Sequence, residues 1–410
     1  MNAFCLNKHS SSILILLFTS NMIICNHALA SGFRITENSI AGIATSNALV
    51  ADNINTGALA YNPAAMSFHK EGNIVAGLTY ATFNLSVIPA GGTKTDNIGK
   101  DSFLLPNLYI MDHINHNWTW GLAINTPFGL ETKWPDNTFP AFGGNNALEP
   151  ALTKLEVINY NPNIAWRLDD NLSVAFGLDY YDVRKANLNS QSTIIEGSGQ
   201  HHGWNIAFLH DMGDLDFGFS YHSPVSVHID GTLGVTAVTS SIELPSTMQF
   251  GLRYHVNDKL AVEIDLDRTG WSSMKSIVIR SKNSGRLLTS STHNWKDANA
   301  WRLGVSYDFN SNTQLRFGYS LDETPQKGDA LYSARTPDTD RQTFSIGIAQ
   351  TISGWTIEAG YMFVILDDHT EYSNTGYTPG PGAEPNGTSA YNGSYEAEGH
   401  MLGLGINKKF

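Results

Sequence analysis

The chain has 410 residues, a formal net charge of −13 and only 15% charged residues, whereas soluble domains carry about 25%. The acidic balance excludes nucleic acid as a partner, because there are too few cations to neutralise phosphates. No stretch approaches the roughly 18 consecutive apolar residues that a membrane helix requires. A helical membrane protein is therefore excluded. A membrane β-barrel is not, because its strands hide their apolar residues by alternation.

The first thirty residues have the pattern of a signal peptide. Lys8 supplies the positive end, an apolar run begins at Ile13, and the tripeptide ending at Ala30 is a typical A-x-A cleavage site before Ser31. Polar residues 19–21 interrupt the apolar run too early for a membrane anchor. We expect residues 1–30 to be removed, which leaves an exported chain without cysteine.

Beyond the leader, apolar and polar residues alternate with period two, the spacing of strands that have different solvents on their two faces. In the clearest run, Leu260, Val262 and Ile264 share one face, whereas Glu263 and Asp265 share the other. The pattern predicts fourteen strands, over residues 72–85, 103–113, 117–126, 155–168, 171–184, 200–210, 214–222, 246–256, 259–268, 299–309, 313–322, 342–351, 354–365 and 398–410.

The connections between these strands alternate between short turns and long polar stretches. The long stretches cover residues 86–102, 127–154, 185–199, 223–245, 269–298, 323–341 and 366–397. Short turns at one end and long loops at the other are typical of outer-membrane barrels. We therefore predict an all-β fold, a 14-stranded antiparallel transmembrane barrel in the Gram-negative outer membrane, with both termini in the periplasm.

Aromatic residues of the outward parity gather near both ends of the predicted strands. One set lies beside the short turns and the other beside the long stretches: Trp118, Trp166, Tyr254, Tyr307 and Trp355, then Tyr180, Tyr221, Trp301, Tyr319 and Tyr361. Two such rings are typical of the interfaces of a membrane barrel. The opposite parity carries charges such as Glu263, Asp265 and Arg302, which are expected to face a wet or plugged lumen.

Residues 31–71 contain no alternating run and are too apolar for a disordered tail. We expect this segment to fold back into the lumen as a plug, with the barrel formed by residues 72–410. Asn62-Pro63-Ala64 is a turn signal, because proline fixes φ and removes an N–H donor. The motif fits either an ordinary turn or a rigid kink in a plug that moves to open a path.

At this point the residues resemble a known family, the FadL-type outer-membrane transporters of long-chain fatty acids and hydrocarbons (OMPP1/FadL/TodX). The N-terminal stretch Ala51 to Met66 reads ADN-x-N-x-G followed by NPAAM and is similar to the hatch of these proteins. Further similar motifs occur along the whole mature chain, at residues 120–130, 244–251, 270–272, 295–297, 315–325 and 337–341. The terminal Phe410 is similar to the signal read by the barrel assembly machinery.

The resemblance implies a monomeric barrel with an N-terminal hatch and no cofactor. It also implies that a hydrophobic ligand is caught at extracellular loops, enters the barrel, and leaves sideways into outer-membrane lipid beneath the lipopolysaccharide. The exit lies at an inward kink in the third strand, which corresponds here to residues 117–126 and the residues that follow. The expected lateral opening therefore involves Asn125, Pro127, Phe128 and Gly129.

Two sets of residues are candidates for contact with such a ligand. Leu130, Trp134, Phe139 and Phe142 could form a capture surface in the stretch 127–154, or could pack the loops against one another. A fatty-acid carboxylate would suit an arginine, and the candidates of inward parity are Arg253, Arg302 and Arg316. Each could instead pair with a lumenal carboxylate, and an aromatic hydrocarbon would need no cation at all.

Other functions fit the sequence less well. An enzyme would need a nucleophile with an oriented histidine, and no such motif stands out; nor does any spacing of metal ligands, although loop acids could bind Ca²⁺. A general diffusion porin would lack the forty-residue plug. The stretch 366–397 could give the protein an added adhesin role. The sequence predicts a transporter of hydrophobic compounds, with long-chain fatty acids as the expected cargo and aromatic hydrocarbons as the alternative.

Overall fold

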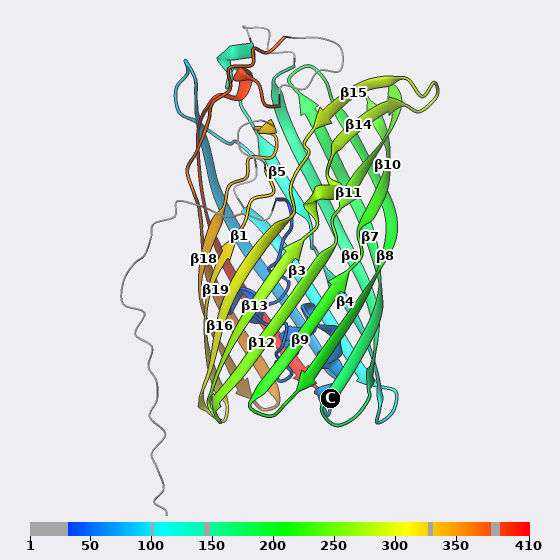
Figure 1. Cartoon of the computed structure of the whole chain (residues 1–410), viewed down its shortest axis with the longest axis vertical. Helices are drawn as coiled ribbons and strands as arrows, with labels where there is room; N and C mark the ends of the chain where they lie inside the picture. The colour runs from blue at the N-terminus through cyan, green and yellow to red at the C-terminus, as the bar shows by residue number, and fades with distance from the viewer. Residues whose placement is uncertain (1–31, 100–101, 143–147, 327–330, 379–385) are drawn as a thin grey trace, which may run out of the picture.

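A computed structural model describes residues 32–99, 102–142, 148–326, 331–378 and 386–410. The predicted leader, with its cleavage site at Ala30 and Ser31, lies outside the described residues. The described part of the chain forms one closed antiparallel barrel (Figure 1). Its fourteen wall strands are β1 (Asn73–Pro89), β3 (Ser102–His113), β4 (Trp118–Asn125), β6 (Pro150–Arg167), β7 (Leu172–Ser190), β8 (Ile195–Asp211), β9 (Leu215–His222), β12 (Thr247–Asn257), β13 (Leu260–Thr269), β16 (Ala298–Asn310), β17 (Thr313–Asp322), β18 (Arg341–Ile352), β19 (Trp355–Leu366) and β21 (Gly393–Lys409).

The barrel closes between its first and last strands. The β1–β21 ladder runs from Asn73 opposite Lys409 to Pro89 opposite Gly393, so neither strand keeps a free edge there. Each of the fourteen predicted segments coincides with one wall strand, which confirms the predicted fold. The outward faces carry exposed apolar and aromatic side chains, including Trp166, which stacks on Trp118 with ring centroids 5.3 Å apart.

The predicted loops are wrong in three places, because the wall continues into them. Two hairpins replace the stretches 223–245 and 269–298 and pair with the wall and with each other: β10 (Val225–Leu233) with β11 (Thr236–Leu244), and β14 (Ser276–Ser281) with β15 (Leu287–Thr292). Likewise β7 and β8 extend over most of 185–199. In β10 the valines and Ile229 face inward whereas Ser226 and His228 are exposed, the reverse of the lipid-facing pattern used to find strands.

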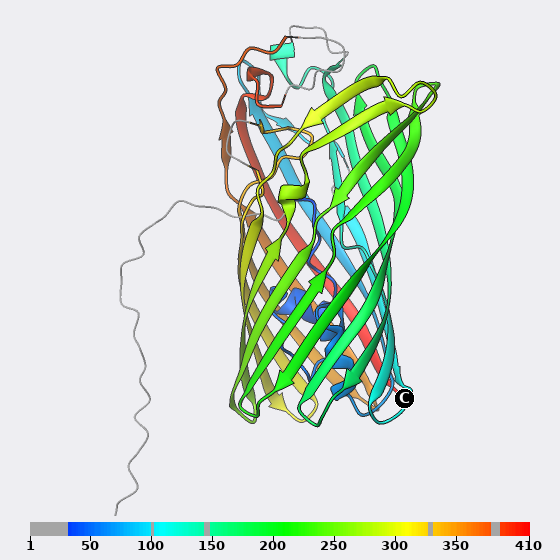
Figure 2. The same ribbon diagram turned by 45° about the vertical axis from the view of Figure 1, so that its right-hand side comes forward.

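Residues 32–72, here called the lumenal segment, lie inside the barrel (Figure 2). They contain α1 (Ile40–Ala44) and the 3₁₀ helices η1 (Thr56–Ala60) and η2 (Pro63–Phe68), each begun by a side chain that accepts a backbone N–H. None of the helices in the described ranges is long and apolar enough to cross a membrane. Smaller strands complete the structure: β2 (Thr95–Asp96), β5 (Gly129–Lys133) and β20 (His369–Glu371), with short helices η3 (Pro140–Phe142), η5 (Trp271–Ser273) and η7 (Ser389–Tyr391).

Candidate ligand site and wall opening

The third wall strand is interrupted where the sequence places Pro127 and Gly129. Strand β4 ends at Asn125 and the chain resumes as β5 at Gly129. On β4 the odd-numbered residues are buried in the lumen, whereas beyond the break Phe128, Thr132 and Trp134 are buried instead. The break therefore shifts the inward parity by one residue and separates β5 from the ladder that β4 makes with β3.

The lumenal segment pairs with the chain at this break. Ile35 N donates to Pro127 O over 2.8 Å, Gly129 N donates to Phe33 O over 3.0 Å, and Arg34 lies opposite Phe128 in an antiparallel bridge. These bonds satisfy backbone groups that the interrupted ladder leaves without strand partners. The position of residues 33–35 is thus tied to the conformation of the third strand.

The backbone edges of β3 and β5 face each other without a described ladder between them, and this break in the wall pairing is here called the window. Strand β3 pairs with β4 only from Leu108 to His113, and in the described ladders its upper part, Ser102–Asn107, pairs with β1 alone. Among the strands that the structure describes, β5 forms a ladder only with β6. Toward the end of the barrel away from the C-terminus, the chain before β3 contacts β5 again, because Ile98 N donates to Lys133 O over 2.8 Å. Pro106 lies in this free edge, and proline within a sheet is confined to edges and bulges; this sequence signal for the window was missed.

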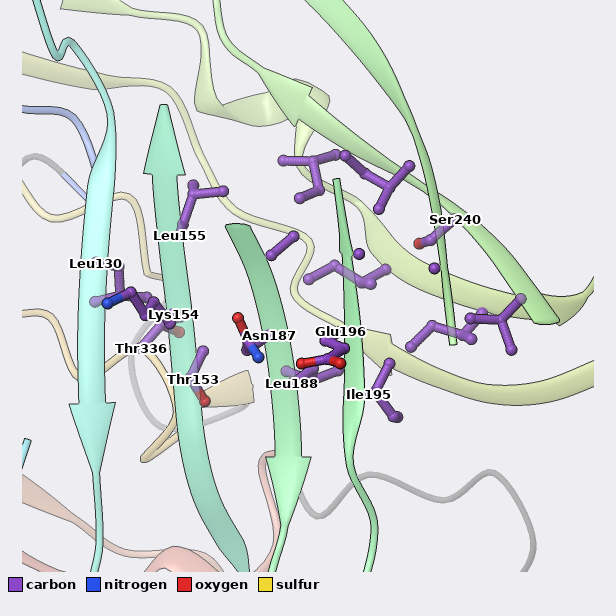
Figure 3. Close-up of a pocket in the computed structure, with 18 of the residues that line it drawn as sticks. Leu130, Thr153, Lys154, Leu155, Asn187, Leu188, Ile195, Glu196, Ser240 and Thr336 are labelled. Carbon is purple, nitrogen blue, oxygen red and sulfur yellow. The ribbon is translucent and has the colours of Figure 1, made fainter. Parts of the chain in front are cut away.

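An apolar cavity of about 90 Å³ is lined by β5, β6, β7 and β8 together with the hairpin strands β10, β11 and β14 (Figure 3). Phe33 of the lumenal segment lines it, together with Leu130 and Leu155 from the wall. Behind it is a buried cluster in which Phe33 packs on Phe128, Trp271 and Trp295, with centroids 4.5–6.1 Å apart. Sequence reasoning missed Phe33 and Trp271 as site residues because their contact joins segments more than 200 residues apart.

The predicted capture residues divide between two places. Leu130 lines the cavity, whereas Trp134, Phe139 and Phe142 belong to a separate buried cluster at the end of the barrel opposite the C-terminus, together with Tyr332, Ala334, Ala390, Tyr391 and Tyr395. Trp134 Nε1 donates to Ala334 O over 2.8 Å. These three aromatic residues pack the loops against one another, as the sequence allowed.

The three candidate arginines are buried and each contacts a protein carboxylate. Arg253 lies 3.0 Å from Glu263 and 3.1 Å from Asp52, and Arg316 lies 2.6 Å from Glu358. Arg302 lies 3.2 Å from each of two aspartates, Asp267 and Asp322. All three lie away from the residues that line the apolar cavity. The structure thus shows the alternative arrangement, in which the arginines are paired inside the protein.

The same charges fasten the middle of the lumenal segment to the wall. Asp265 accepts hydrogen bonds from Leu49 N and Val50 N, over 2.9 and 3.1 Å, and Glu263 accepts one from Ala51 N over 2.7 Å. Arg302 also donates to Ser46 O. Residues 46–52, here called the anchor, are held to the wall by these bonds and by the ion pair between Asp52 and Arg253. Removing one partner of a buried ion pair is strongly destabilising, so detaching the anchor would be costly.

The Asn62-Pro63-Ala64 motif is a second place where the lumenal segment is hydrogen-bonded to the wall. Asn62 Nδ2 donates to Val50 O and to Phe208 O of β8, and its Oδ1 accepts from Ala64 N, over 2.7–3.0 Å. Pro63 begins η2, where its missing N–H has no cost. The motif holds two parts of the lumenal segment and the wall together, and its role as a moving kink remains a prediction.

The tip of the lumenal segment is held by the loop before β18. Asp338 accepts hydrogen bonds from Gly32 N, over 3.2 Å, and from Thr324 Oγ1, over 2.8 Å. Burial raises the pKa of Asp338 to about 7. In the described residues no group of three or more histidine, cysteine, aspartate and glutamate side chains could hold a metal ion.

Residues 21–410 match the family described as outer membrane protein transport protein (OMPP1/FadL/TodX). The chain belongs to this family. Its members are transport proteins rather than enzymes, and the protein is an outer-membrane protein. Among curated relatives, the 47 kDa outer membrane protein of Pasteurella multocida is 28% identical and covers 84% of this chain and 90% of its own. The long-chain fatty acid transport protein of Escherichia coli O6:H1 is 24% identical, covering 94% of this chain and 95% of its own.

Solved structures of FadL-type proteins share the fold. A Pseudomonas aeruginosa FadL homologue superposes with a TM-score of 0.75 at 17% identity, covering 93% of this chain and all of its own. The Ralstonia pickettii toluene transporter TbuX gives a TM-score of 0.65 at 16% identity, covering 91% of this chain and 98% of its own. At these identities the likeness concerns the architecture of the OMPP1/FadL/TodX barrel.

Proposed function

We propose that this protein carries hydrophobic compounds, with long-chain fatty acids as the main cargo, into the outer membrane through the window between β3 and β5. The observation that carries the proposal is the position of residues 33–35. Phe33 lines the apolar cavity, and the backbone of Phe33 and Ile35 is hydrogen-bonded to the break beside the window. A ligand that displaces Phe33 therefore also frees the third strand.

The energetics of an acyl chain suit this route. Each buried CH₂ group gains roughly 0.8 kcal/mol, so a long chain leaves water for an apolar groove. A cavity of about 90 Å³ is smaller than the roughly 300–1,000 Å³ of pockets that enclose drug-sized ligands. A long chain can enter only if Phe33 and the neighbouring residues of the lumenal segment move away. The fixed anchor at residues 46–52 would confine that movement to the tip.

The direction of exit follows from the position of Ile35 at the window. A Cβ atom added at Gly129 would lie 2.9 Å from Ile35 Cδ1, so Ile35 packs against the window edge of β5. When residues 33–35 withdraw, the cavity and the lipid-facing wall become continuous. Lateral discharge then avoids returning the chain to water beneath a lipopolysaccharide leaflet.

A neutral aromatic cargo is the second candidate. The described cavity lining contains one cation, Lys154, and its Nζ lies 2.8 Å from Glu131 and 2.7 Å from Glu156. An apolar site with this pair of carboxylates beside its lysine favours a ligand without negative charge. The name of the toluene transporter TbuX shows that such cargo occurs in one protein of this fold.

The barrel assembly machinery is a further partner in this proposal. Phe410 is anchored by its backbone, because Phe410 N donates to Gly72 O over 2.9 Å, while its side chain is exposed at the strand end. That geometry leaves the aromatic ring available to the barrel assembly machinery. The closed ladder also makes a monomer sufficient for transport.

The test is uptake of labelled oleate and labelled toluene by a transporter-deleted Gram-negative host. We expect the intact protein to restore oleate uptake. Ala186→Phe, which fills the cavity from β7, should abolish it, while Leu178→Phe on the lipid face of the same strand should not. Toluene uptake alone would move the cargo to aromatic hydrocarbons. Leakage of small sugars without uptake of either compound would contradict the proposal and favour a porin.

A further inference from the structure

Within the described residues, four buried polar atoms at the lower corner of the window have no hydrogen-bond partner. They are Nδ2 and Oδ1 of Asn107, Oδ1 of Asn125 and Oγ1 of Thr79. The three side chains are at most 8% exposed. A buried polar group without a partner is costly, and native structures retain few of them without a reason.

The sheet register places Asn107 on the strand between those that carry Thr79 and Asn125. Leu108 opposite Ile124 is the last described pair of the β3–β4 ladder, so Asn107 and Asn125 occupy the next facing positions, where the two strands separate. Thr79 lies on β1, two residues from Gly77, which is the partner of Asn107. All three side chains are on the buried, lumenal face.

A glycine makes room for this corner. A Cβ atom added at Gly77 would lie 2.7 Å from Asn107 Oδ1 and 3.0 Å from Ile40 Cγ1. The Asn107 amide therefore lies between the wall and the first residue of α1, directly below the gap between β3 and β5. Beside it, the Tyr109 hydroxyl donates to Asn38 O, so the lumenal segment borders the corner on a second side.

The corner carries no charge and offers both hydrogen-bond donors and hydrogen-bond acceptors. The Asn107 amide nitrogen and the Thr79 hydroxyl can donate, and the oxygens of Asn107 and Asn125 can accept. A terminal hydroxyl group or a protonated carboxyl group of an amphiphile has the same two needs, whereas a carboxylate accepts from the donors alone. If such a group entered the window without hydrogen bonds, it would pay the full cost of leaving water.

We propose that Thr79, Asn107 and Asn125 form a head-group site, which binds the terminal oxygen-bearing group of the cargo while its chain enters the window. The inference rests on the proposed function and adds the part of the path that handles the polar end. Because the three residues carry no charge, the head group is held by hydrogen bonds and leaves without breaking an ion pair. The buried arginines are then not needed for cargo.

The experiment compares two cargoes that differ only at one end, labelled oleate and labelled (Z)-9-octadecene, in which a methyl group replaces the carboxyl group. In the transporter-deleted host, Asn107→Leu should lower the oleate uptake rate by about tenfold, the effect of losing one to two hydrogen bonds, and leave (Z)-9-octadecene uptake unchanged. Asn163→Leu is the matched control, because Asn163 is also a buried lumenal asparagine but is hydrogen-bonded to Asn161 and Asn205. Heat-modifiable migration in gels verifies that each variant is folded.

Each outcome decides the inference. Equal loss of both cargoes would show that Asn107 is only structural and would overturn the head-group site. Unchanged uptake of both would show that the corner holds water alone and would also overturn it. If the unsubstituted protein carries (Z)-9-octadecene but not oleate, the site has no ligand and the inference fails while transport stands. Uptake of neither by the unsubstituted protein would overturn the proposed function itself.

Discussion

Gly318 marks a very close approach of the wall to the lumenal segment. A Cβ atom at this position on β17 would overlap the backbone of Thr45 and Ser46. We therefore expect Gly318→Ala to push the anchor away from the wall and open a leak through the lumen, while the barrel still assembles. Single-channel conductance in planar bilayers measures the leak. Gly376→Ala is the control, because nothing lies within 4 Å of a Cβ there; equal conductance of the two variants would contradict the prediction.

Asp338 makes the stability of the extracellular side depend on pH. Burial raises its pKa to about 7, whereas an aspartate in an unfolded chain has a pKa of about 3.9. The folded protein therefore binds more protons between these values, and its stability falls as the pH rises from about 4 to 7. Asp338→Asn should flatten this slope in thermal unfolding measured in detergent from pH 4 to 8.

The flattening will be partial, since burial also raises the pKa of Asp340, to about 6. Asp258→Asn is the control, because Asp258 lies exposed in a turn. A slope that is the same in Asp338→Asn and in the unsubstituted protein would refute the assignment to Asp338.

The partners of individual residues are where sequence reasoning reaches its limit. Alternation places Arg253, Arg302 and Arg316 in the lumen, because period-two patterning reports the face of a strand directly. It does not report which carboxylate lies opposite, since Arg316 and Glu358 come from strands that are not adjacent in sequence. The pairing depends on the register of several ladders at once.

The same limit applies to the third strand as an element. The sequence places a strand at 117–126 and a break near Pro127, and both are present. The pairing of residues 33–35 with residues 127–129 has no local signal, because the two segments lie about ninety residues apart and each is too short to show a period. The window follows from that long-range contact and from the free edge of β3.

A reversible cross-link tests whether this contact must open. Arg34 and Phe128 face each other in an antiparallel bridge flanked by the bonds from Ile35 N and Gly129 N, the type of pair with Cα atoms about 4.5 Å apart, within reach of a disulfide. The sequence after residue 30 contains no cysteine. We expect the double variant Arg34→Cys, Phe128→Cys to lose uptake when oxidised and to regain it with reductant. Uptake by each single variant should be the same under oxidising and reducing conditions. Uptake by the oxidised double variant would show that the contact stays closed during transport.

At the scale of the whole molecule, the solvent outside the wall changes along the barrel axis. Near the short turns the outward residues are apolar, as in Leu252 and Ile264, and there the sequence locates every strand. In β10 the outward residues are polar, as in His228 and Asp230. The wall therefore continues beyond the lipid with polar residues facing outward and apolar residues facing inward. Alternation with apolar outward faces does not identify this part of the wall as strands.

This reversal predicts which end of the barrel faces the outside of the cell. Val235, in the turn between β10 and β11, is fully exposed, and Ser311 is exposed in the short turn between β16 and β17 at the other end, where the C-terminus lies (Figure 1). Because the predicted mature chain has no cysteine, each can be replaced singly by cysteine. On intact cells a membrane-impermeant maleimide should label Val235→Cys but not Ser311→Cys, and should label both after the outer membrane is permeabilised. Labelling of Ser311→Cys alone on intact cells would show that the barrel has the opposite orientation, with the end that carries the C-terminus facing outward.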